Sequence, residues 1–292
     1  MTMANDISNR ATVLEVHSIL KNTILKHLGG DREFLCLSIL GSRMWRMHRP
    51  DSDFDIVVIY MDSMKAYTST TVKSTLSSQR IEPYTYATST YSASEFDISY
   101  MEINHFAKQL TKGNCNAIWT LTTPLMFIPD DSNEESVISK LRTIFLRNGF
   151  VYDMWPSIKG ITFSNIIDMN KRIDVRSFKK SFLTGARNLA YYREAAMTGS
   201  VYEPYNTINE SKIMRGARYL VSTLDDAISN EVNIKKCKEY LDSCIQEIES
   251  SIVNNSQFSY HCNDFGPVNE RLIIPCIHTE IVRRLAKSEG IS

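Results

Sequence analysis

The chain has 292 residues, of which 43% are hydrophobic and 23% are charged, and its formal net charge at pH 7 is zero. This composition is typical of a soluble globular protein with one large or two modest domains. No run of 18 apolar residues predicts a membrane span, and the N-terminus lacks the pattern of a secretory signal. The six cysteines show no disulfide-framework spacing, so we expect reduced thiols in a cytoplasmic protein.

The first third of the chain alternates helical and strand patterns. Apolar residues at helical spacing predict a helix over 8–28 that ends at Gly29-Gly30. Three apolar runs then predict strands, and they read EFLCLSIL (33–40), FDIVVIY (54–60) and FDISYMEI (96–103). Between the last two, residues 67–94 are rich in Ser, Thr and Tyr, which indicates a long connection, either a polar hairpin or a mobile loop.

Residues 104–121 have helical spacing, and after about residue 135 the pattern is nearly all helical. A helical segment broken at Gly113 follows the third strand, and a final helix over 271–289 is expected to be interrupted near Pro275. The other helical spans are predicted at 134–148, 160–197, 208–229 and 232–254. We therefore expect an α+β fold, with a mixed sheet and flanking helices in residues 1–133 and a helical domain in residues 134–292.

The charge is unevenly distributed between these parts. Residues 140–193 hold eleven Lys and Arg against three acids. Such a local excess can bind a polyphosphate or a nucleic-acid backbone. The alternative is that these charges form an ordinary solvent-exposed face of helices.

Two aspartates stand at the start of the second predicted strand. Because side chains alternate along a strand, Asp53 and Asp55 are expected on one face, with Phe54 turned toward the core. Paired carboxylates repel unless a cation lies between them, and Mg²⁺ prefers oxygen ligands, so the pair can bridge two metal ions. Asp97, at the start of the next strand, can supply a third carboxylate. Turn chemistry at Asp53-Phe54-Asp55 and local capping by Asp97 remain as alternatives.

A Gly-Ser turn precedes the aspartates by ten residues. A glycine lets the backbone approach a phosphate closely, and the hydroxyl of Ser42 adds a donor, so Gly41-Ser42 can hold a triphosphate. The turn lacks the Gly-Lys-Ser/Thr ending of a Walker A loop.

Together these residues resemble the DNA polymerase β-type nucleotidyltransferase superfamily, whose pattern is Gly-Ser, a spacer, Asp-x-Asp and a later acid. The closer resemblance is to a bacterial and phage group of nucleotidyltransferases that includes RNA-ligase-associated members. It rests on GSR (41–43), PDSDFD (50–55) and DISYMEINHFAKQLTKGNCNAIWTL (97–121), and it covers roughly residues 34–128. Two residues depart from the pattern of this group: Cys115 stands where the group has proline, and Trp119 stands near its usual acid.

The resemblance implies a polymerase-β-like palm and a metal-dependent enzyme that transfers a nucleoside monophosphate from an NTP, such as ATP, to a hydroxyl. It implies that Asp53, Asp55 and Asp97 are catalytic ligands of two Mg²⁺ or Mn²⁺ ions. Gly41, Ser42 and Arg43 would contact the triphosphate. Lys212, with Arg218 in support, would act as a phosphate clamp from the helical domain, although both residues can equally be ordinary surface cations.

Several further residues carry weaker expectations. The loop residues Arg46, His48 and Arg49 could line the acceptor path, and Asn114 and Asn116 could contact a sugar or base. Three aromatic residues at helical spacing are expected in the core rather than against a base, and these are Trp119, Tyr191 and Tyr192. The Cys and His residues at 261–262 and 276–278 match no zinc-module spacing.

Three functions follow from this reasoning. The first is nucleotidyl transfer to RNA or tRNA ends, with the basic region as the nucleic-acid contact. The second is nucleotidylation of a protein hydroxyl or a small molecule, and the third is a catalytically inactive relative that only binds nucleotide. No membrane partner is expected, and the oligomeric state is left open.

Overall fold

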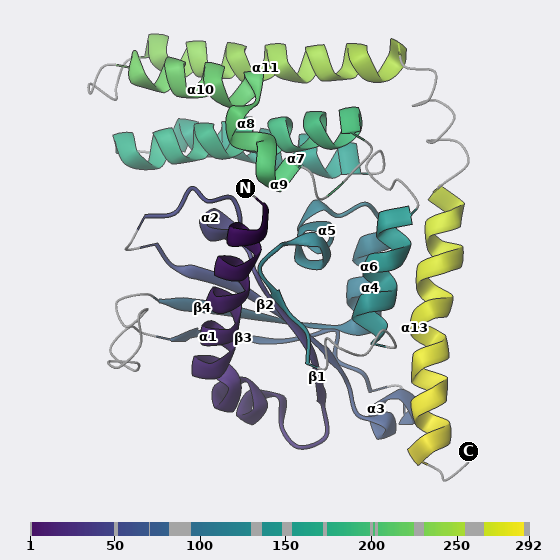
Figure 1. Ribbon diagram of the computed structural model, residues 1–292. Coiled ribbons are helices and arrows are strands. Elements are labelled where there is room, and N and C mark those ends of the chain that lie inside the picture. The colour runs from purple at the N-terminus through teal and green to yellow at the C-terminus, as the bar shows by residue number, and fades with distance from the viewer. Residues whose placement is uncertain are drawn as a thin grey trace. The chain divides into compact units, whose positions relative to one another are not determined.

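The computed structural model (Figure 1) describes most of the chain and divides it into two compact units. Unit 1 comprises residues 1–112, 116–147 and 269–292, and unit 2 comprises residues 113–115 and 148–268. The described residues are 2–49, 52–69, 71–81, 95–129, 136–147, 154–171, 174–198, 201, 204–224, 231–254 and 266–288. The division differs from the expected boundary at 133/134, because helices from the end of the chain and from residues 137–147 group with the sheet.

Unit 1 is built on a five-stranded mixed sheet with the order β3-β4-β2-β1-β5. The strands are β1 (Glu33–Ile39), β2 (Phe54–Met61), β3 (Thr75–Ile81), β4 (Phe96–Glu102) and β5 (Met126–Phe127). β2 and β4 run parallel, whereas the pairs β1–β2, β1–β5 and β3–β4 are antiparallel. The three strands expected from the sequence are confirmed as β1, β2 and β4.

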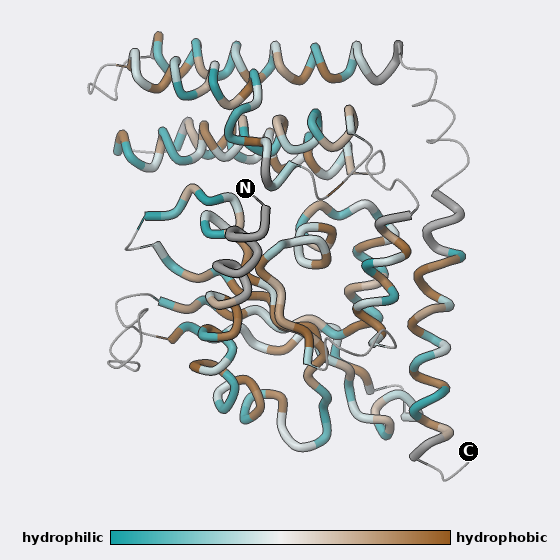
Figure 2. Tube along the Cα trace, viewed as in Figure 1, coloured by the Kyte–Doolittle hydropathy of each residue, from teal (hydrophilic) through white to brown (hydrophobic). Residues whose placement is uncertain are grey.

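One face of the sheet packs against helix α1 (Thr2–Leu28). Alternate residues of β2 and β4 are buried there, including Phe54, Ile56, Phe96 and Ile98, and they form one core cluster with the apolar stripe of α1. Figure 2 shows the apolar residues gathered along the strands. The helix starts earlier than expected and ends as predicted, because Gly29 adopts φ 77°, a left-handed conformation that suits glycine.

The other helices that the structure describes for unit 1 are spread along the chain. They are α2 (Gly41–Met44), α3 (Met64–Ser69), α4 (Ile103–Thr111), α5 (Cys115–Thr122), α6 (Val137–Arg147) and α13 (Gly266–Ser288). The break between α4 and α5 falls at Gly113, as expected, with φ 66°. The expected interruption at Pro275 is wrong, because α13 continues through this proline. A proline inside a helix removes one backbone hydrogen bond, and the buried Ile273 and Ile277 on either side hold this helix in place.

Unit 2 is helical. It contains α7 (Trp155–Lys171), α8 (Val175–Thr198), α9 (Pro204–Thr207), the 3₁₀ helix η3 (Ile208–Glu210), α10 (Lys212–Ser222) and α11 (Glu231–Asn254). The expected helix over 160–197 is therefore two helices, and the one over 208–229 begins as a 3₁₀ turn. Tyr191 and Tyr192 are fully buried, as expected for core residues, and in unit 1 Trp119 is 4% exposed.

Where it is described, the Ser/Thr/Tyr-rich segment agrees with the polar-hairpin alternative. Its first residues end α3, and residues 75–81 form β3, an edge strand that pairs antiparallel with β4. Residues 82–94 lie outside the described part of the chain. Among the helices that the structure describes, none has the length and apolar character needed to span a membrane.

Candidate active site

Two of the predicted acids are direct neighbours across parallel strands. In the β2–β4 register Asp55 pairs with Asp97, so both side chains leave the sheet on the same face. This face is opposite the α1 core, because the flanking residues Phe54 and Ile56 are buried in that core. Asp53 is exposed and precedes Asp55 by the two-residue spacing that repeats on one face of a strand. We call these three residues the carboxylate edge.

The predicted Gly-Ser turn lies directly against this edge. Gly41 has φ 61°, and a Cβ atom at this position would overlap the carboxylate of Asp55. The backbone N–H of Leu40 donates to the carbonyl oxygen of Asp55 at 2.8 Å, which ties the turn to the start of β2. Only glycine allows both the left-handed backbone and this close approach. The structure therefore brings Gly41 and Asp55 together, as the sequence predicted.

The side chain of Arg43 contacts the loop that leads from the Gly-Ser turn to β2. Its side chain is 8% exposed, and the guanidinium lies over the ring of Phe54 at 3.6 Å from the centroid. It donates from Nη2 to the carbonyl oxygen of Ser52 at 2.5 Å and from Nε to that of Asp53 at 3.3 Å. These contacts favour a positioning role, in which Arg43 holds the loop that carries Asp53, over the predicted contact with a triphosphate.

A cation that the sequence reasoning missed stands beside the third acid. Arg80 lies opposite Asp97 in the β3–β4 register, and its Nε is 3.9 Å from Oδ1 of Asp97. Its Nη2 also pairs with the carboxylate of Glu95. The position of Arg80 beside Asp97 follows only from the pairing of β3 with β4, and the polar composition of residues 75–81 did not define that strand.

The donor set fits a hard divalent cation by its chemistry. Asp53, Asp55 and Asp97 offer carboxylate oxygens on or near one strand edge, and Mg²⁺ and Mn²⁺ favour such ligands. Within the described residues, no three His, Cys, Asp or Glu side chains converge as a ready-made metal site. A metal bound at this edge would compete with Arg80 for Asp97.

The two predicted clamp residues lie on α10 of unit 2. Lys212 is an exposed side chain whose Nζ lies 3.6 Å from Oε1 of Glu247. Arg218 donates to the backbone and side-chain oxygens of Asn209, at 2.8 and 2.5 Å. Each is held by neighbours within its own unit, and the role in phosphate binding stays a prediction.

The loop after the Gly-Ser turn carries the weaker acceptor-path candidates. Arg46 has φ 55°, and the backbone N–H of Arg49 donates to Oγ of Ser52 at 2.9 Å. Burial, and then the charge of Arg43, lower the pKa of His48, so its ring is neutral near pH 7. His48 therefore adds no positive charge to this loop near pH 7.

Cys115, at the start of α5, contacts a residue of α7. The backbone N–H of Cys115 donates to Oγ of Ser157 at 3.0 Å, and that hydroxyl donates to the Cys115 sulfur at 3.2 Å. Asn114 and Asn116 flank this contact, and their predicted role toward a sugar or base stays a prediction. Of the Cys and His residues considered for zinc, those at 261–262 lie outside the described residues.

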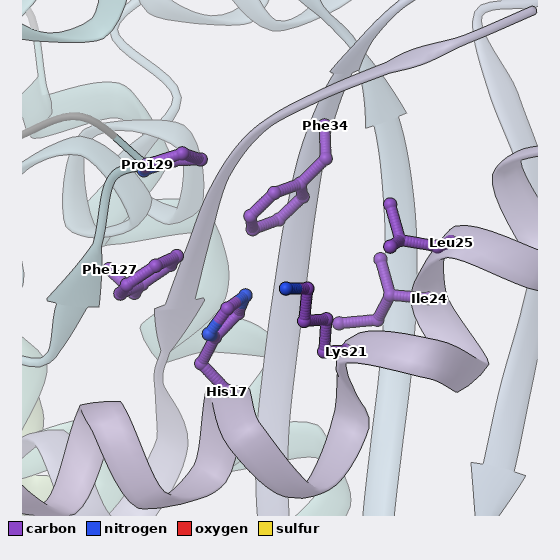
Figure 3. A pocket seen from close by; sticks show the side chains of 7 residues that line it. All are labelled: His17, Lys21, Ile24, Leu25, Phe34, Phe127 and Pro129. Carbon is purple, nitrogen blue, oxygen red and sulfur yellow. The ribbon is translucent and has the colours of Figure 1, made fainter.

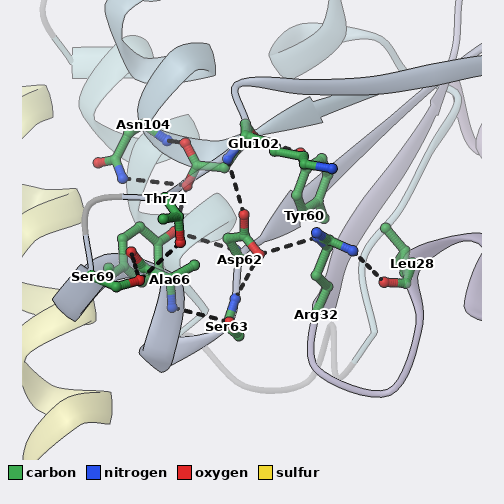
Figure 4. Close-up of polar contacts among 12 residues, drawn as sticks. Leu28, Arg32, Tyr60, Asp62, Ser63, Ala66, Ser69, Thr71, Glu102 and Asn104 are labelled. Atoms are coloured by element: carbon green, nitrogen blue, oxygen red, sulfur yellow. Dashed lines mark hydrogen bonds and ion pairs between the residues drawn. The ribbon is translucent and has the colours of Figure 1, made fainter.

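A second pair of acids stands at the other end of the same strands, and we call Asp62 and Glu102 the buried acid pair (Figure 4). Asp62 is 4% exposed and forms an ion pair with Arg32 at 3.1 Å. Glu102 is 1% exposed, accepts from Tyr67, and caps α4 by accepting from the backbone of Asn104 at 2.8 Å. Burial raises the pKa of Glu102, and its hydrogen bonds oppose that rise.

Comparison with known proteins adds no relative to this geometry. No protein-family model matches the chain, and no curated protein sequence matches it at a significant level.

Proposed function

We propose that the chain is a metal-dependent nucleotidyltransferase with a polymerase-β-like palm, which transfers a nucleoside monophosphate from an NTP to a hydroxyl. The observation that carries the proposal is the β2–β4 register, which makes Asp55 and Asp97 neighbours on one face, with the Gly41 turn against Asp55. A glycine turn next to paired carboxylates suits a triphosphate bound together with its cations.

Each residue has a separate task in this proposal. Asp53 and Asp55 would hold two Mg²⁺ or Mn²⁺ ions, and Asp97 would hold the one nearer the acceptor. When bound, such ions neutralise the triphosphate and favour ionisation of the acceptor hydroxyl. The Gly41-Ser42 turn binds the triphosphate through backbone N–H groups and the Ser42 hydroxyl, and Arg43 fixes the loop that carries Asp53.

The transfer itself is a single displacement. The acceptor oxygen forms a bond to the α-phosphorus while the bond from that phosphorus to the pyrophosphate oxygen breaks. Asp97 accepts the proton of the acceptor hydroxyl, and pyrophosphate leaves toward the Gly-Ser turn. Arg80, beside Asp97, is close enough to this acceptor side to influence how strongly Asp97 attracts a cation.

RNA or tRNA is the proposed acceptor because of the basic stretch at residues 140–193, most of which lies in unit 2. The basic excess of residues 140–193 falls largely on α7 and α8, and its exposed members include Lys171, Arg176 and Lys180 near the turn between these helices. A cluster of exposed cations at one helical turn suits a phosphate backbone.

The test is label transfer from each α-³²P-labelled NTP, with Mg²⁺ or Mn²⁺, to total RNA and to cell lysate. We expect labelled RNA with the wild-type chain and none with the double variant Asp53→Asn/Asp55→Asn. The matched control is Asp31→Asn, because Asp31 is an exposed acid in the turn before β1 and away from the carboxylate edge.

The outcomes separate the proposals. Transfer by the double variant would show that the site is wrong, and absence of transfer by the wild-type chain to any acceptor would overturn the activity. Label on protein instead of RNA would move the acceptor to a protein hydroxyl. RNA binding that fails to weaken with rising salt would contradict a phosphate-backbone contact.

A further inference from the structure

A pocket of about 290 Å³ lies on the α1 side of unit 1, away from the carboxylate edge (Figure 3). Its lining comes from α1, the start of β1 and the region of β5, and comprises His17, Lys21, Ile24, Leu25, Phe34, Phe127 and Pro129. Ile24 belongs to the core cluster under α1, and Phe34 and Phe127 pack against that cluster. Asp55 leaves the sheet on the opposite face, so this pocket is separate from the proposed active site.

Three aromatic rings in the pocket are nearly parallel. His17 stacks on Phe127 with centroids 3.7 Å apart and planes at 17°, and on Phe34 at 5.7 Å and 15°. The planes of Phe34 and Phe127 differ by 14°. Rings that share one orientation offer a stacking direction to a further planar group, because offset stacking between parallel rings is favourable.

A single cation accompanies these rings. The amino group of Lys21 points toward His17 and Phe34 in Figure 3. Across the described ranges, no carboxylate lies within ion-pair distance of it. Burial, and then the charge of Lys21, lower the pKa of His17, so that near pH 7 His17 is neutral and Lys21 supplies the positive charge.

We propose that this pocket binds a small planar aromatic molecule that carries a negative charge. Its ring stacks along the faces of Phe34 and Phe127, and its anionic group lies beside the amino group of Lys21. Ile24, Leu25 and Pro129 supply the apolar walls. The volume is at the lower limit for ligand pockets, so the ligand has one or two rings and is smaller than a nucleoside triphosphate.

Three probes of matched shape or charge test the proposal. They are 1-naphthoate, the neutral 1-naphthalenemethanol with the same rings, and cyclohexanecarboxylate with the same charge and no aromatic ring. Titration followed by the methyl resonances of isoleucine and leucine gives both the affinity and the location. We expect 1-naphthoate to bind at least about tenfold more tightly than either of the other probes.

The methyl groups locate the binding within α1. Leu25 lines the pocket and is 44% exposed, whereas Leu14 on the same helix is 46% exposed and lies outside the lining. The resonances of Ile24 and Leu25 should shift with 1-naphthoate while that of Leu14 stays in place. Equal shifts of Leu14 and Leu25 would mean adsorption to the surface of the helix and would overturn the proposal.

Substitutions separate the charge from the stacking. Lys21→Gln should weaken 1-naphthoate roughly tenfold and leave 1-naphthalenemethanol unchanged, whereas Lys26→Gln, an exposed lysine outside the lining, should change neither. Phe34→Leu should weaken both aromatic probes. No binding of 1-naphthoate to the wild-type chain, or an equal loss in the two lysine variants, would overturn the proposal. The lysines are exposed, so these variants remain informative even where Phe34→Leu fails to fold.

Discussion

The parallel strands β2 and β4 carry acids at both ends, and the acids at the two ends differ in solvent exposure. Asp53 and Asp55 are exposed at one end, while Asp62 and Glu102 at the other are almost completely buried. The buried acid pair is satisfied by Arg32, Tyr67 and backbone N–H groups. A buried acid whose oxygens accept hydrogen bonds supports the fold, whereas exposed acids side by side on neighbouring strands are accessible to a ligand from solvent. The same residue type thus serves structure at one end and, in our proposal, chemistry at the other.

The largest expected effect is on activity at the exposed end. Asp55→Asn should lower the rate of label transfer by roughly 100- to 1,000-fold, because one oxygen ligand and its charge are lost. The unfolding temperature should stay close to that of the wild-type chain, since Asp55 is exposed. Initial rates and thermal unfolding measure the two quantities. Retention of most of the rate would remove Asp55 from the site.

The matched change at the buried end should act on stability instead. Glu102→Ala removes the acceptor for Tyr67 and for two backbone N–H groups at the start of α4, and should lower the free energy of unfolding by about 2–4 kcal/mol. Asp97→Ala, at the other end of β4, should cost no more than about 1 kcal/mol. Urea unfolding distinguishes them. Equal losses would show that exposure does not separate the two ends.

A pair of glycine substitutions tests how closely the Gly-Ser turn approaches the carboxylate edge. Gly41→Ala should lower the free energy of unfolding by about 1–3 kcal/mol and also lower the transfer rate, because the new Cβ displaces Asp55. Gly29→Ala meets no atom within 4 Å and adds only left-handed strain, about 1 kcal/mol. A Gly29→Ala variant that is as inactive as Gly41→Ala would contradict the close approach.

Arg80 allows a smaller test at the exposed end. Because a cation already paired with Asp97 opposes a second one, Arg80→Ala should lower the Mg²⁺ concentration that gives half-maximal transfer by a few-fold. Its effect on the free energy of unfolding should be under about 1 kcal/mol, since the pair is exposed. Lys65→Ala, an exposed cation on α3, is the control. An increased Mg²⁺ requirement would instead make Arg80 part of the substrate site.

The smallest expected effect is a pH dependence from the buried end. Because burial raises the pKa of Glu102, the folded chain holds this proton at pH values where the unfolded chain has lost it. This contribution to the free energy of unfolding is therefore complete below the ordinary pKa of 4.5 and is lost as pH rises through the raised value. Urea unfolding of the wild-type chain and of Glu102→Gln between pH 4 and 8 should diverge in this direction. Parallel curves would contradict the raised pKa.

The sequence predicted those elements whose burial alternates strongly. β2 and β4 carry apolar residues on the core face, and Gly113 breaks the helix after β4, so these features were visible in the residues alone. For β3 the sequence left a polar hairpin and a mobile loop as alternatives and gave no strand bounds, because most of its side chains are exposed and an edge strand needs no apolar pattern. The continuation of α13 through Pro275 depends on burial of neighbouring isoleucines, which local sequence does not report.

The candidate site shows the same division. Asp53, Asp55, Asp97 and Gly41 share a spacing that predicted their proximity, and the register of β2 and β4 brings Asp55 beside Asp97. Arg80 was missed because its place follows from a strand pairing and not from a motif. The structural role of the buried acid pair depends on Arg32 and Tyr67, which contact Asp62 and Glu102 only in the folded chain.

Unit 1 is made of segments that are separated in the sequence, so the ribosome synthesises them at different times. Residues 269–292 belong to unit 1, and Arg284 on α13 pairs with Glu33 at the start of β1. The ribosome makes all of unit 2 before it makes this helix, so the sheet must wait for its final helix while the inserted unit is already available to fold. During that interval the surface that receives Ile273 and Ile277 is open to water and to chaperones. Loss of residues 269–288 would thus leave the nascent sheet without the helix that covers this surface.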